Sequence, residues 1–405
     1  MTREMILPRP RRPITLLIAA FGLILSVGTA GATPLSSAQI LSQFNAVVFG
    51  NFSNSSDVQG RAVVGGNVSA GAGFNQAPGS AAASSFSGLM VYGNETGSNS
   101  FSINGSLTIL GSNSASVNLN AGGSVFVGAG NSGTINGNGG AVAASINGNN
   151  TGQITLNSGG AVRINGNTGN VSVNGGTGLI YTGSVTGSLN MNNGATATQA
   201  ASAGITPPAL PDFNSTFKAP LTALSTQLAG QSANSTVRVS GSSITFNAAP
   251  NASGIAVFDI NTSLFMANST VTINLDGATS VIINVNVDSC VDVTCAYSFL
   301  NSVNFSNPTS YADEVLWNFV NATGITFSNE FGGTVLAPLA AVSNSSPIDG
   351  TVVANSFSGS GELHSYPFTG GLPGGTVATP EPGGLLTFGI ALAGLGAIRY
   401  RRRKR

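Results

Sequence analysis

The chain has 405 residues and a formal net charge of zero, yet charged residues make up only 7% of it, against about a quarter in a typical soluble domain. Ten of its 14 Lys and Arg residues lie in the first twelve or the last seven positions. Between residues 33 and 378, four basic and twelve acidic residues leave a net charge of about −8. This acidic body, poor in arginine, excludes nucleic acid and anionic lipid headgroups as its main partners.

The N-terminus has the three parts of a secretory signal. Its basic segment contains four arginines: Arg3, Arg9, Arg11 and Arg12. An apolar run follows at residues 14–27, and Ala30 and Ala32 then flank Gly31 in a small-x-small cleavage site. We therefore predict a signal peptide over residues 1–32. The alternative, a permanent N-terminal anchor, is disfavoured because the apolar run is short for a bilayer.

The C-terminus also has the three parts of a targeting signal, in a different order. Pro380, Glu381 and Pro382 precede an apolar run at residues 385–398, which ends in a basic cluster at residues 399–405. As a helix, residues 383–400 would extend about 27 Å, barely enough to cross a membrane. The basic cluster would stay on the cytoplasmic side. A simple tail anchor is one interpretation of this segment.

The order of motif, apolar run and arginine cluster resembles the PEP-CTERM sorting signal of Gram-negative bacteria that produce exopolysaccharide. The resemblance covers residues 379–405, and we take residues 380–405 as the sorting and anchor segment. It implies processing by an exosortase-type machinery. It also implies export through the inner membrane, a transient stay there on a C-terminal transmembrane helix, and delivery to the cell surface or matrix.

Between the two ends, short apolar runs predict an all-β protein. From residue 107 to residue 191 their centres recur about every nine residues, and Gly-Asn, Asn-Gly or Gly-Gly pairs separate most of them. Two or three such strands would complete one coil of a parallel β-helix, so we expect a coil of about 18 to 27 residues. A β-sandwich is the competing architecture, but its strands are usually longer. Asn residues beside the strands fit either stacked amide ladders or left-handed turns.

The strand pattern divides the body, residues 33–368, into parts. We expect a short helix over residues 37–47, strands at residues 48–52, 61–64 and 65–68, and a loop over residues 70–85. Gly/Asn-rich coils follow over about residues 88–195, and a helix over about residues 211–232 is expected to pack on the solenoid flank, kinked or split at Pro220. A second strand block covers residues 236–368, with a brief helical turn at residues 313–319, and residues 369–379 are a linker.

The two cysteines, Cys290 and Cys295, have four residues between them in the chain and predict a local disulfide in an oxidising compartment. Two cysteines and one distant histidine do not make a zinc site. We expect no cofactor and no bound metal. A calcium site built from Asp288 and Asp292 is an alternative without a supporting Asp-rich spacing.

Catalytic groups are scarce. Arg163 is the only charged residue between residues 97 and 211, so the Gly/Asn-rich coils lack the paired carboxylates that glycan cleavage needs. Four acids of the second block are the candidates for a polysaccharide lyase or hydrolase: Asp259, Asp276, Asp288 and Asp292. His364 adjoins Glu362 and Ser365 but is expected at a core edge rather than in a catalytic triad. We predict that the protein is not an enzyme and has no catalytic residues.

Two further pairs of residues each have a structural interpretation and a functional one. Asp57 and Arg61 lie in one Gly-bounded turn and are expected to form a local ion pair. Trp317 and Phe319 would share one face of a strand, either as a core wedge or as a platform on which a sugar stacks. We favour the core.

Two sequence blocks resemble the choice-of-anchor A domain. The first is FNAVVFGNF at residues 44–52, continuing to VGGNV at residues 64–68. The second includes VLWNF at residues 315–319, GTVLAP at residues 333–338, IDGTVVA at residues 348–354 and ELHSYPF at residues 362–368. The blocks bracket about residues 40–370. The resemblance implies an adhesive β-helical domain on a bacterial surface and implies no catalytic residue.

The sequence therefore predicts an exported structural or adhesive protein of the cell surface, biofilm or matrix. Its expected partners are the exosortase-type machinery, an extracellular polysaccharide or surface ligand, and the membrane through its C-terminal helix, but not nucleic acid. A polysaccharide-active β-helix enzyme is the main alternative. Ice binding is more remote, because Thr134, Thr155 and Thr182 are too irregularly spaced to form a threonine row.

Overall fold

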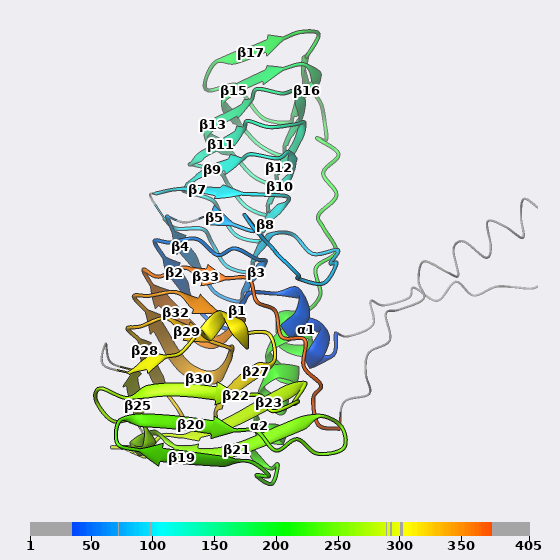
Figure 1. Cartoon of the computed structure of the whole chain (residues 1–405). Helices are drawn as coiled ribbons and strands as arrows, with labels where there is room; N and C mark the ends of the chain where they lie inside the picture. Colours follow the sequence, from blue (N-terminus) through cyan, green and yellow to red (C-terminus); the bar gives the residue numbers. More distant parts are fainter. Residues whose placement is uncertain are drawn as a thin grey trace, which may run out of the picture. The chain divides into compact units, whose positions relative to one another are not determined.

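The computed structural model describes residues 35–374, apart from residues 72, 98, 289, 292, 293 and 300–302. The predicted signal peptide and the predicted sorting segment lie outside the described residues. Within the described part, no helix is both long enough and apolar enough to cross a bilayer. What is described belongs to one compact unit built almost entirely of parallel β-strands (Figure 1).

The strands are the rungs of a solenoid with three faces, which we name face A, face B and face C. In the coils between residues 107 and 199, each strand pairs in parallel with one 17 to 19 residues further along the chain. This spacing lies at the short end of the coil length expected from the sequence. The all-β class and the parallel solenoid are therefore confirmed, and the β-sandwich is excluded.

Face A contains the longest continuous ladder. Its strands, from the lower end of the solenoid in Figure 1 to the upper, are β21 (Ile255–Asn261), β23 (Ser280–Asn286), β27 (Val315–Phe319), the first part of β30 (Thr334–Asn344), the first part of β32 (Val352–Gly359), β1 (Ala46–Val48), β3 (Ala62–Val64), β6 (Leu89–Val91), β8 (Leu107–Ile109), β10 (Gly123–Val127), β12 (Val142–Ile146), β14 (Gly160–Ile164), β16 (Gly176–Tyr181) and β18 (Ala197–Gln199).

Face B is narrower, and in the upper coils it shrinks to single bridging residues. Its strands, in the same direction, are β25 (Thr294–Phe299), with β24 (Cys290–Val291) folded against it, β28 (Gly324–Phe327), the second parts of β30 and β32, β2 (Phe52–Asn54) and β4 (Val68–Ala70). Above β4 the ladder continues through Glu95, Asn113, Asn131, Asn150, Thr168 and Val185.

Face C closes the coils. Its strands are β19 (Thr236–Ser240), β20 (Ser243–Asn247), β22 (Thr270–Asn274), β26 (Asn304–Phe305), β29 (Phe331–Gly332), β31 (Ile348–Asp349), β33 (Leu363–His364), β5 (Gly73–Phe74), β7 (Ser100–Ile103), β9 (Ser116–Leu119), β11 (Thr134–Gly137), β13 (Asn150–Leu156), β15 (Thr168–Asn174) and β17 (Leu189–Asn192). Two 3-10 turns, η2 (Thr262–Leu264) and η3 (Pro308–Ser310), connect the lower coils.

The first described strand lies in the middle of the solenoid rather than at one end. Strand β1 pairs with β3 on one side and with β32, about 300 residues later, on the other. From β1 the coils rise to β18, and residues 200–212 then return along the flank. The second strand block starts at the lower end and climbs until β32 meets β1. Asn45 spans this junction, because its Nδ2 donates to the carbonyls of Gly350 (2.8 Å) and His364 (2.9 Å).

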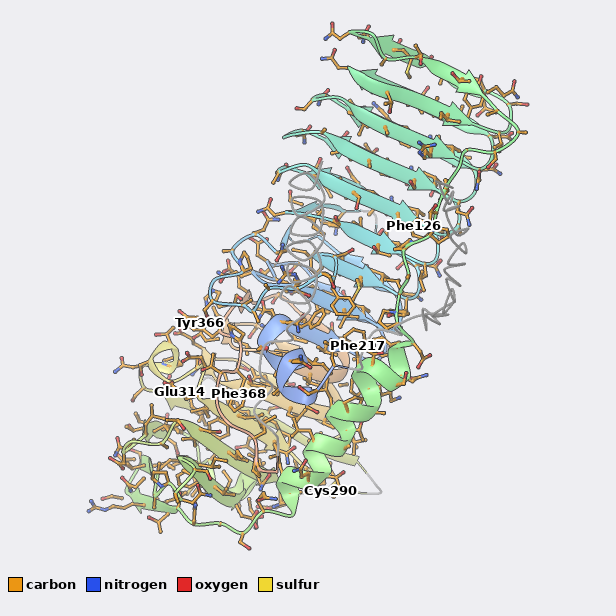
Figure 2. The ribbon with its side chains drawn as sticks, turned by 90° about the vertical axis from the view of Figure 1, so that its right-hand side faces the viewer. Phe126, Phe217, Cys290, Glu314, Tyr366 and Phe368 are labelled. Atoms are coloured by element: carbon orange, nitrogen blue, oxygen red, sulfur yellow. A yellow bond between two sulfur atoms is a disulfide. The ribbon has the colours of Figure 1, made fainter. Side chains whose placement is uncertain are left out.

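Two helices cover the outer side of face A. Helix α1 (Ser37–Gln43) starts at a capping box formed by Ser36 and Gln39, and α2 (Ala219–Ala229) is the predicted flanking helix. Figure 2 shows α2 lying across the strands of face A. Phe217, Leu221 and Leu228, all fully buried, pack there with outward-facing strand residues such as Val47. A second core thus lies outside the solenoid, beside the continuous one inside it.

Several predicted boundaries need correction. The predicted helix over residues 37–47 ends at Gln43, and the predicted strand at residues 48–52 is instead the corner between β1 and β2. The predicted loop over residues 70–85 contains β5. Pro220 stands in the first turn of α2, directly after a π-helical turn (Asn214–Lys218), so the helix changes type next to the place where a kink or split was expected. The predicted helical turn at residues 313–319 is largely β27.

Asparagines stack at the coil corners as amide ladders. The Oδ1 of Asn67 accepts from the backbone N–H of Asn94 (2.8 Å), and the Oδ1 of Asn94 accepts from that of Ser112 (2.9 Å). Farther along, Asn136 Nδ2 donates to Asn118 Oδ1 (3.0 Å). Neither Asn118 nor Asn136 has a positive φ. The ladder explanation is therefore correct for these residues, and the left-handed turn explanation is not.

Candidate functional site

The outer side of face B carries one hydroxyl side chain from nearly every coil. We call this set the hydroxyl row. Its members occupy equivalent positions along the ladder: Ser298, Thr326, Ser343, Ser358, Ser53, Ser69, Thr96, Ser114, Ser132, Thr151 and Thr186, interrupted only by Gly169. Strand spacing sets neighbouring members about 4.8 Å apart. The row is thus a regular line of small, uncharged polar groups along the length of the solenoid.

Hydrogen bonds fix the upper hydroxyls of the row. Each donates to a backbone carbonyl of the coil below, as Thr96 does to Val68 (3.1 Å) and Thr186 to Thr168 (3.1 Å). Ser114 donates in the same way to the carbonyl of Glu95 at 3.1 Å. A hydroxyl whose proton is engaged offers its oxygen lone pairs to solvent. The row therefore presents ordered hydrogen-bond acceptors. Because these side chains are already held in place, a ligand that binds them costs little further side-chain entropy.

Buried asparagines support the row from inside. Asn113 Nδ2 donates to Asn131 Oδ1 and Asn131 Nδ2 donates to Asn150 Oδ1, both at 2.7 Å, and these three residues are at most 1% exposed. Each amide also donates to the carbonyl two residues ahead, which is that of Gly133 (3.1 Å) for Asn131. This internal stack holds the corner next to the row, so adjacent coils stay in register.

The middle of the hydroxyl row lies in a shallow groove of about 510 Å³ on face B. Its walls come from strands far apart in sequence, β30 and β32 on one side and β2 and β4 on the other. Hydroxyls of the row line it together with the amides of Asn51 and Asn67, and no charged residue takes part. Its size falls within the usual range of small-ligand sites. The groove suits a neutral, hydroxyl-rich ligand rather than an ionic one.

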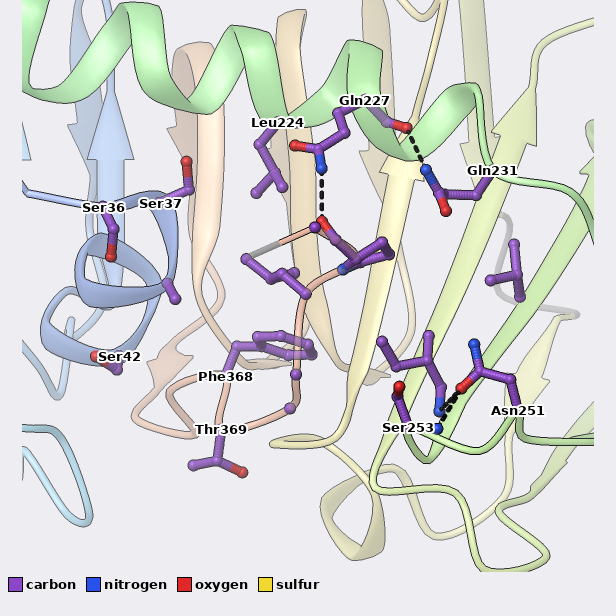
Figure 3. A pocket seen from close by; sticks show the side chains of 18 of the residues that line it. Ser36, Ser37, Ser42, Leu224, Gln227, Gln231, Asn251, Ser253, Phe368 and Thr369 are labelled. Atoms are coloured by element: carbon purple, nitrogen blue, oxygen red, sulfur yellow. Dashed lines mark hydrogen bonds between the residues drawn. The ribbon is translucent and has the colours of Figure 1, made fainter. Parts of the chain in front are cut away.

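A second groove, of about 1060 Å³, lies between α1, α2 and residues 368–374 (Figure 3). Its lining is also uncharged, and it includes Ser36 and Gly374, which lie at or next to the two ends of the described chain. Gln227 crosses it, with its Nε2 donating to the Pro373 carbonyl (2.5 Å). The segment after β33 is thereby tied to α2.

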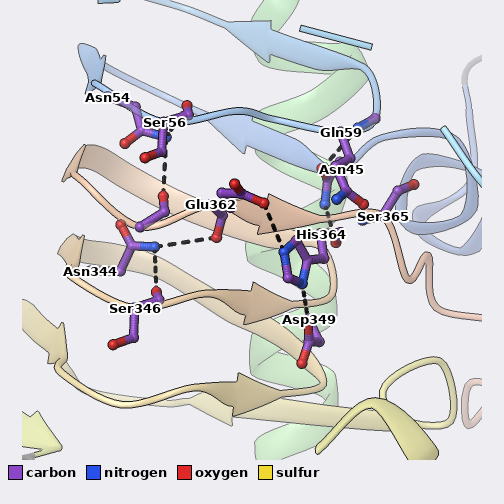
Figure 4. Close-up of polar contacts among 12 residues, drawn as sticks. Asn45, Asn54, Ser56, Gln59, Asn344, Ser346, Asp349, Glu362, His364 and Ser365 are labelled. Atoms are coloured by element: carbon purple, nitrogen blue, oxygen red, sulfur yellow. Dashed lines mark hydrogen bonds and ion pairs between the residues drawn. The ribbon is translucent and has the colours of Figure 1, made fainter. Parts of the chain in front are cut away.

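His364 lies between two carboxylates on face C, as Figure 4 shows. Its Nδ1 is 2.5 Å from Asp349 Oδ1, and its Nε2 is 2.9 Å from Glu362 Oε2. Burial raises the pKa of Asp349 to about 6, against the opposing effect of the His364 hydrogen bond. Burial lowers the pKa of His364, but the bonds to both carboxylates outweigh it and leave this pKa above its ordinary value.

Ser365, which follows His364 in the chain, does not face the His364 cluster. The hydroxyl of Ser365 donates to the Pro78 carbonyl (2.8 Å), so it is turned toward another segment. The side chain of Asp349 is fully buried, and Tyr311, whose pKa burial also raises, is buried nearby. We interpret the cluster as a structural link between the last coils, in line with the core-edge role expected for His364.

The acids of the second strand block have separate local roles. Asp259 accepts from Asn286 Nδ2 (2.9 Å), Asp288 accepts from the Ser263 N–H (2.8 Å), and Asp276 stands in a left-handed turn with φ of 46°. Asp292 lies outside the described residues. Among the side chains that the structure describes, no three His, Cys, Asp or Glu residues gather as they would around a metal ion.

The remaining predicted residues have mixed outcomes. The sorting motif (Pro380, Glu381, Pro382) and the cleavage site (Ala30, Ala32) lie outside the described residues. A disulfide joins Cys290 to Cys295, with Cα atoms 4.3 Å apart. Trp317 and Phe319 are fully buried, so the core interpretation is confirmed and the stacking platform is excluded.

The predicted ion pair between Asp57 and Arg61 is wrong. Asp57 Oδ1 instead accepts from the Gly73 N–H (2.7 Å), and Arg61 reaches the Ala82 carbonyl (3.5 Å). Both ion pairs found among the described side chains involve His364. Asp57 therefore fixes the coil through a backbone hydrogen bond rather than through a charge pair.

Sequence analysis missed the hydroxyl row because it tested only threonine. In the upper coils a Ser or Thr recurs every 18 or 19 residues, at Thr96, Ser114, Ser132 and Thr151, and this period was detectable. The lower half was not, because Ser53 lies next to Ser358 through a pairing across about 300 residues. Thr134 and Thr155, which were weighed for ice binding, lie on face C.

With the geometry established, the family can be assigned. The sequence matches the family described as "Putative Ice-binding-like adhesive domain" in two overlapping segments, residues 37–145 and 118–365. The chain belongs to this family. The two segments together cover about four-fifths of the chain and nearly all of its described coils. Membership in a family of adhesive domains supports an adhesive role at a surface or outside the cell.

Two solved structures resemble this member of the family weakly. One is an ice binding protein from an Antarctic bacterium, Flavobacteriaceae, with 13% identity, a TM-score of 0.25, and coverage of 83% of this chain and 99% of the other. The second is the tapirin C-terminal domain of Caldicellulosiruptor kristjanssonii, with 12% identity, a TM-score of 0.24, and coverage of 80% and 94%. Scores this low support no inference about function. No curated protein matches the sequence.

Proposed function

We propose that this protein is a non-enzymatic adhesin of the cell surface or extracellular matrix, which binds neutral polysaccharide along face B. The observation that carries the proposal is the uncharged groove of about 510 Å³ in the middle of the hydroxyl row. Sugar hydroxyls would donate to the serine and threonine oxygens that line the groove. Contacts repeated from coil to coil would make weak individual binding strong for a long polymer.

The test is a binding assay with charge placed in the groove. Ser69 is exposed and in register with Ser53, so Ser69→Lys introduces a bulky cation without disturbing the interior. We expect binding of purified protein to neutral matrix polysaccharide to fall at least about tenfold, equivalent to about 1.4 kcal/mol.

The matched control is Ser172→Lys, which places the same charge on an outward position of face C. Binding by this variant should equal that of the unmodified protein. Equal losses in both variants would mean that net charge, not the groove, governs adhesion, and the site would have to be abandoned.

The absence of catalysis belongs to the same proposal. The acids of the second block are engaged in separate local hydrogen bonds, such as that between Asp259 and Asn286. Incubation of the protein with neutral and acidic glycans should release no new reducing ends and no unsaturated products. Release of either would favour the alternative, a polysaccharide-active β-helix enzyme.

Ice binding is a second candidate, favoured by the regularity of the hydroxyl row. Eleven of its twelve positions carry Ser or Thr at the strand spacing, whereas the sequence alone had suggested irregular threonines. Thr151→Tyr places a bulky ring in the flat upper part of the row, outside the groove. If ice is the ligand, this change should abolish inhibition of ice recrystallisation while polysaccharide binding is preserved.

We further propose that residues 1–32 direct export and that residues 379–405 are a sorting tail processed by exosortase-type machinery, with a transient membrane stay. The sequence pattern supports this proposal. In the native host, Glu381→Ala should leave the protein in the membrane fraction at its unprocessed mass. Normal release of that variant to the surface would contradict the role of the motif.

A further inference from the structure

The upper end of the solenoid presents unpaired strand edges on all three faces. Among the described strands, β17 pairs only with β15 and β18 pairs only with β16. On face B, Val185 bridges only to Thr168. No described segment covers these edges. Alternate backbone N–H and C=O groups along them therefore lack a strand to bind.

The hydrophobic interior is also open at this end. The inward side chains of Leu189 and Met191 are only partly buried. One coil below, their ladder partners Val171 and Val173 are 1% and 0% exposed. Val185 is 41% exposed. Apolar surface that the coil below buries against its neighbours therefore faces solvent here.

The lower end shows what a closed end looks like in the same molecule. Asn234 covers the free edge of β21, since its Oδ1 accepts from the Val257 N–H (2.7 Å) and its N–H donates to the Val257 carbonyl (3.1 Å). Strand β19 folds back antiparallel over β20. Phe246 and Phe258 are accordingly buried. The outer edge of β19 carries a charged residue, Arg238, whereas the strands at the upper end carry none.

No charge protects the upper end from association. Natural edge strands usually carry charged residues that block pairing with another chain. Here Arg163 is the only charged residue between residues 97 and 211, and its Nη1 is engaged with the Ala203 carbonyl (2.7 Å) on the flank. Two copies could therefore bring these ends together without electrostatic repulsion.

We propose that the upper end, residues 176–199, is an interface with the same end of a second copy of this chain. A two-fold axis across the solenoid would set the exposed edges antiparallel to each other, and it would bury Leu189, Met191 and Val185 in a continuous core. Because a two-fold contact uses the same end of both copies, pairing stops at a closed dimer instead of propagating into a fibre. This inference goes beyond the proposed function, and it would double the number of hydroxyl rows per particle.

The test measures the mass of the full chain, in mild detergent, across a dilution series by analytical ultracentrifugation. The expected mass at high concentration is twice that of the monomer. The double variant Asn190→Lys, Thr198→Lys charges exposed positions on β17 and β18 and should remain monomeric throughout. Asn136→Lys, on an outward position of face C in a middle coil, is the matched control and should dimerise normally.

Hydrogen exchange provides a readout that needs no substitution. The amides of residues 189–192 and 197–199 should exchange several-fold more slowly at concentrations where the dimer forms. A monomeric mass at every concentration would overturn the proposal. A dimer that persists in the double variant, or whose protected amides lie elsewhere, would overturn it as well.

Discussion

Asn131 illustrates how much of the solenoid depends on single buried amides. Its side chain donates to Asn150 and to the Gly133 carbonyl, and accepts from Asn113. Three coils therefore meet at one residue. An apolar core alone would hold these coils together but would not fix their register, because hydrophobic contacts have little directional preference.

We expect Asn131→Ala to lower the free energy of unfolding by about 3 kcal/mol, since it leaves buried polar groups of Asn113 and Asn150 without partners. Denaturant unfolding followed by circular dichroism measures this. Asn136→Ala breaks a comparable amide pair on the partly exposed outer side of face C and should cost less than about 1 kcal/mol. Similar losses for both would contradict the importance of burial.

The His364 cluster predicts a pH dependence. In the folded protein the pKa of Asp349 is raised to about 6 and that of His364 is also raised, so the native state holds protons more tightly than the unfolded chain. The stability that these two groups contribute is therefore present at low pH and lost as pH rises. For Asp349 the loss falls between its ordinary pKa near 4 and about 6. For His364 it begins above about 6.5.

The measurement compares unfolding free energies of the unmodified protein and variants from pH 4 to pH 8. Asp349→Asn should remove the decrease in its lower window, and His364→Gln should remove the decrease above it. Subtracting variant from parent cancels the titration of other carboxylates. A difference that grows more favourable with rising pH would show that the sign is wrong.

At the scale of elements, α2 stabilises the solenoid from outside. Asn318 Nδ2 donates to the Ser225 carbonyl (2.9 Å) and Asn284 Nδ2 donates to the Leu228 carbonyl (2.8 Å), so buried amides of face A bind the last turns of the helix. The apolar stripe of α2 adds burial along the same contact.

We expect Leu221→Ala, at a fully buried position, to cost about 2–5 kcal/mol, because the cavity it leaves is held open by rigid strands. Limited proteolysis should then cleave within residues 200–230 first. Thr226→Ala on the exposed side of the same helix should change neither result. An equal loss of stability in the control would contradict the packing explanation, because Ala has a higher helix propensity than Thr.

The elements that the sequence predicted well are those with one exposed side. In the Gly/Asn-rich coils, inward Val and Ile alternate with outward Ser and Asn, so both strand type and coil length followed from the pattern. Strand β27 was mistaken for a helical turn because it is buried on both sides. Leu316 packs toward α2 while Trp317 lies in the solenoid core, which leaves no polar alternation to detect.

At the scale of the whole molecule, coil stacking should make the upper solenoid modular. Gly160 pairs with Val142, so deletion of residues 142–159 removes one coil and leaves every remaining strand in register. We expect this shortened protein to fold cooperatively with somewhat lower stability, since each coil contacts only its neighbours. Circular dichroism and thermal unfolding test this.

A deletion of half that length, residues 142–150, is the control. It would place a face C strand where a face A strand belongs, and the product should be insoluble or unfolded. If the one-coil deletion behaved in the same way, the coils could not be independent units, and a cooperative contact with residues 200–212 would have to explain the fold.

The interleaving of the two halves could not be predicted, because no local pattern specifies that β1 lies between β3 and β32. The groove of the proposed site depends on this arrangement, since its walls come from both halves. Sequence reasoning therefore identified the type of surface, uncharged and rich in hydroxyls, but not its position.

The position of β1 in the middle of the solenoid also has a mechanical consequence. Residues at both ends of the described chain border one groove beside α1, so a tether attached at either end would hold the solenoid near its middle. Tension between such a tether and a ligand bound in the groove on face B would load the middle coils, where β1 pairs with β32. The upper coils beyond the ligand would carry no load and could not be unravelled from their tip.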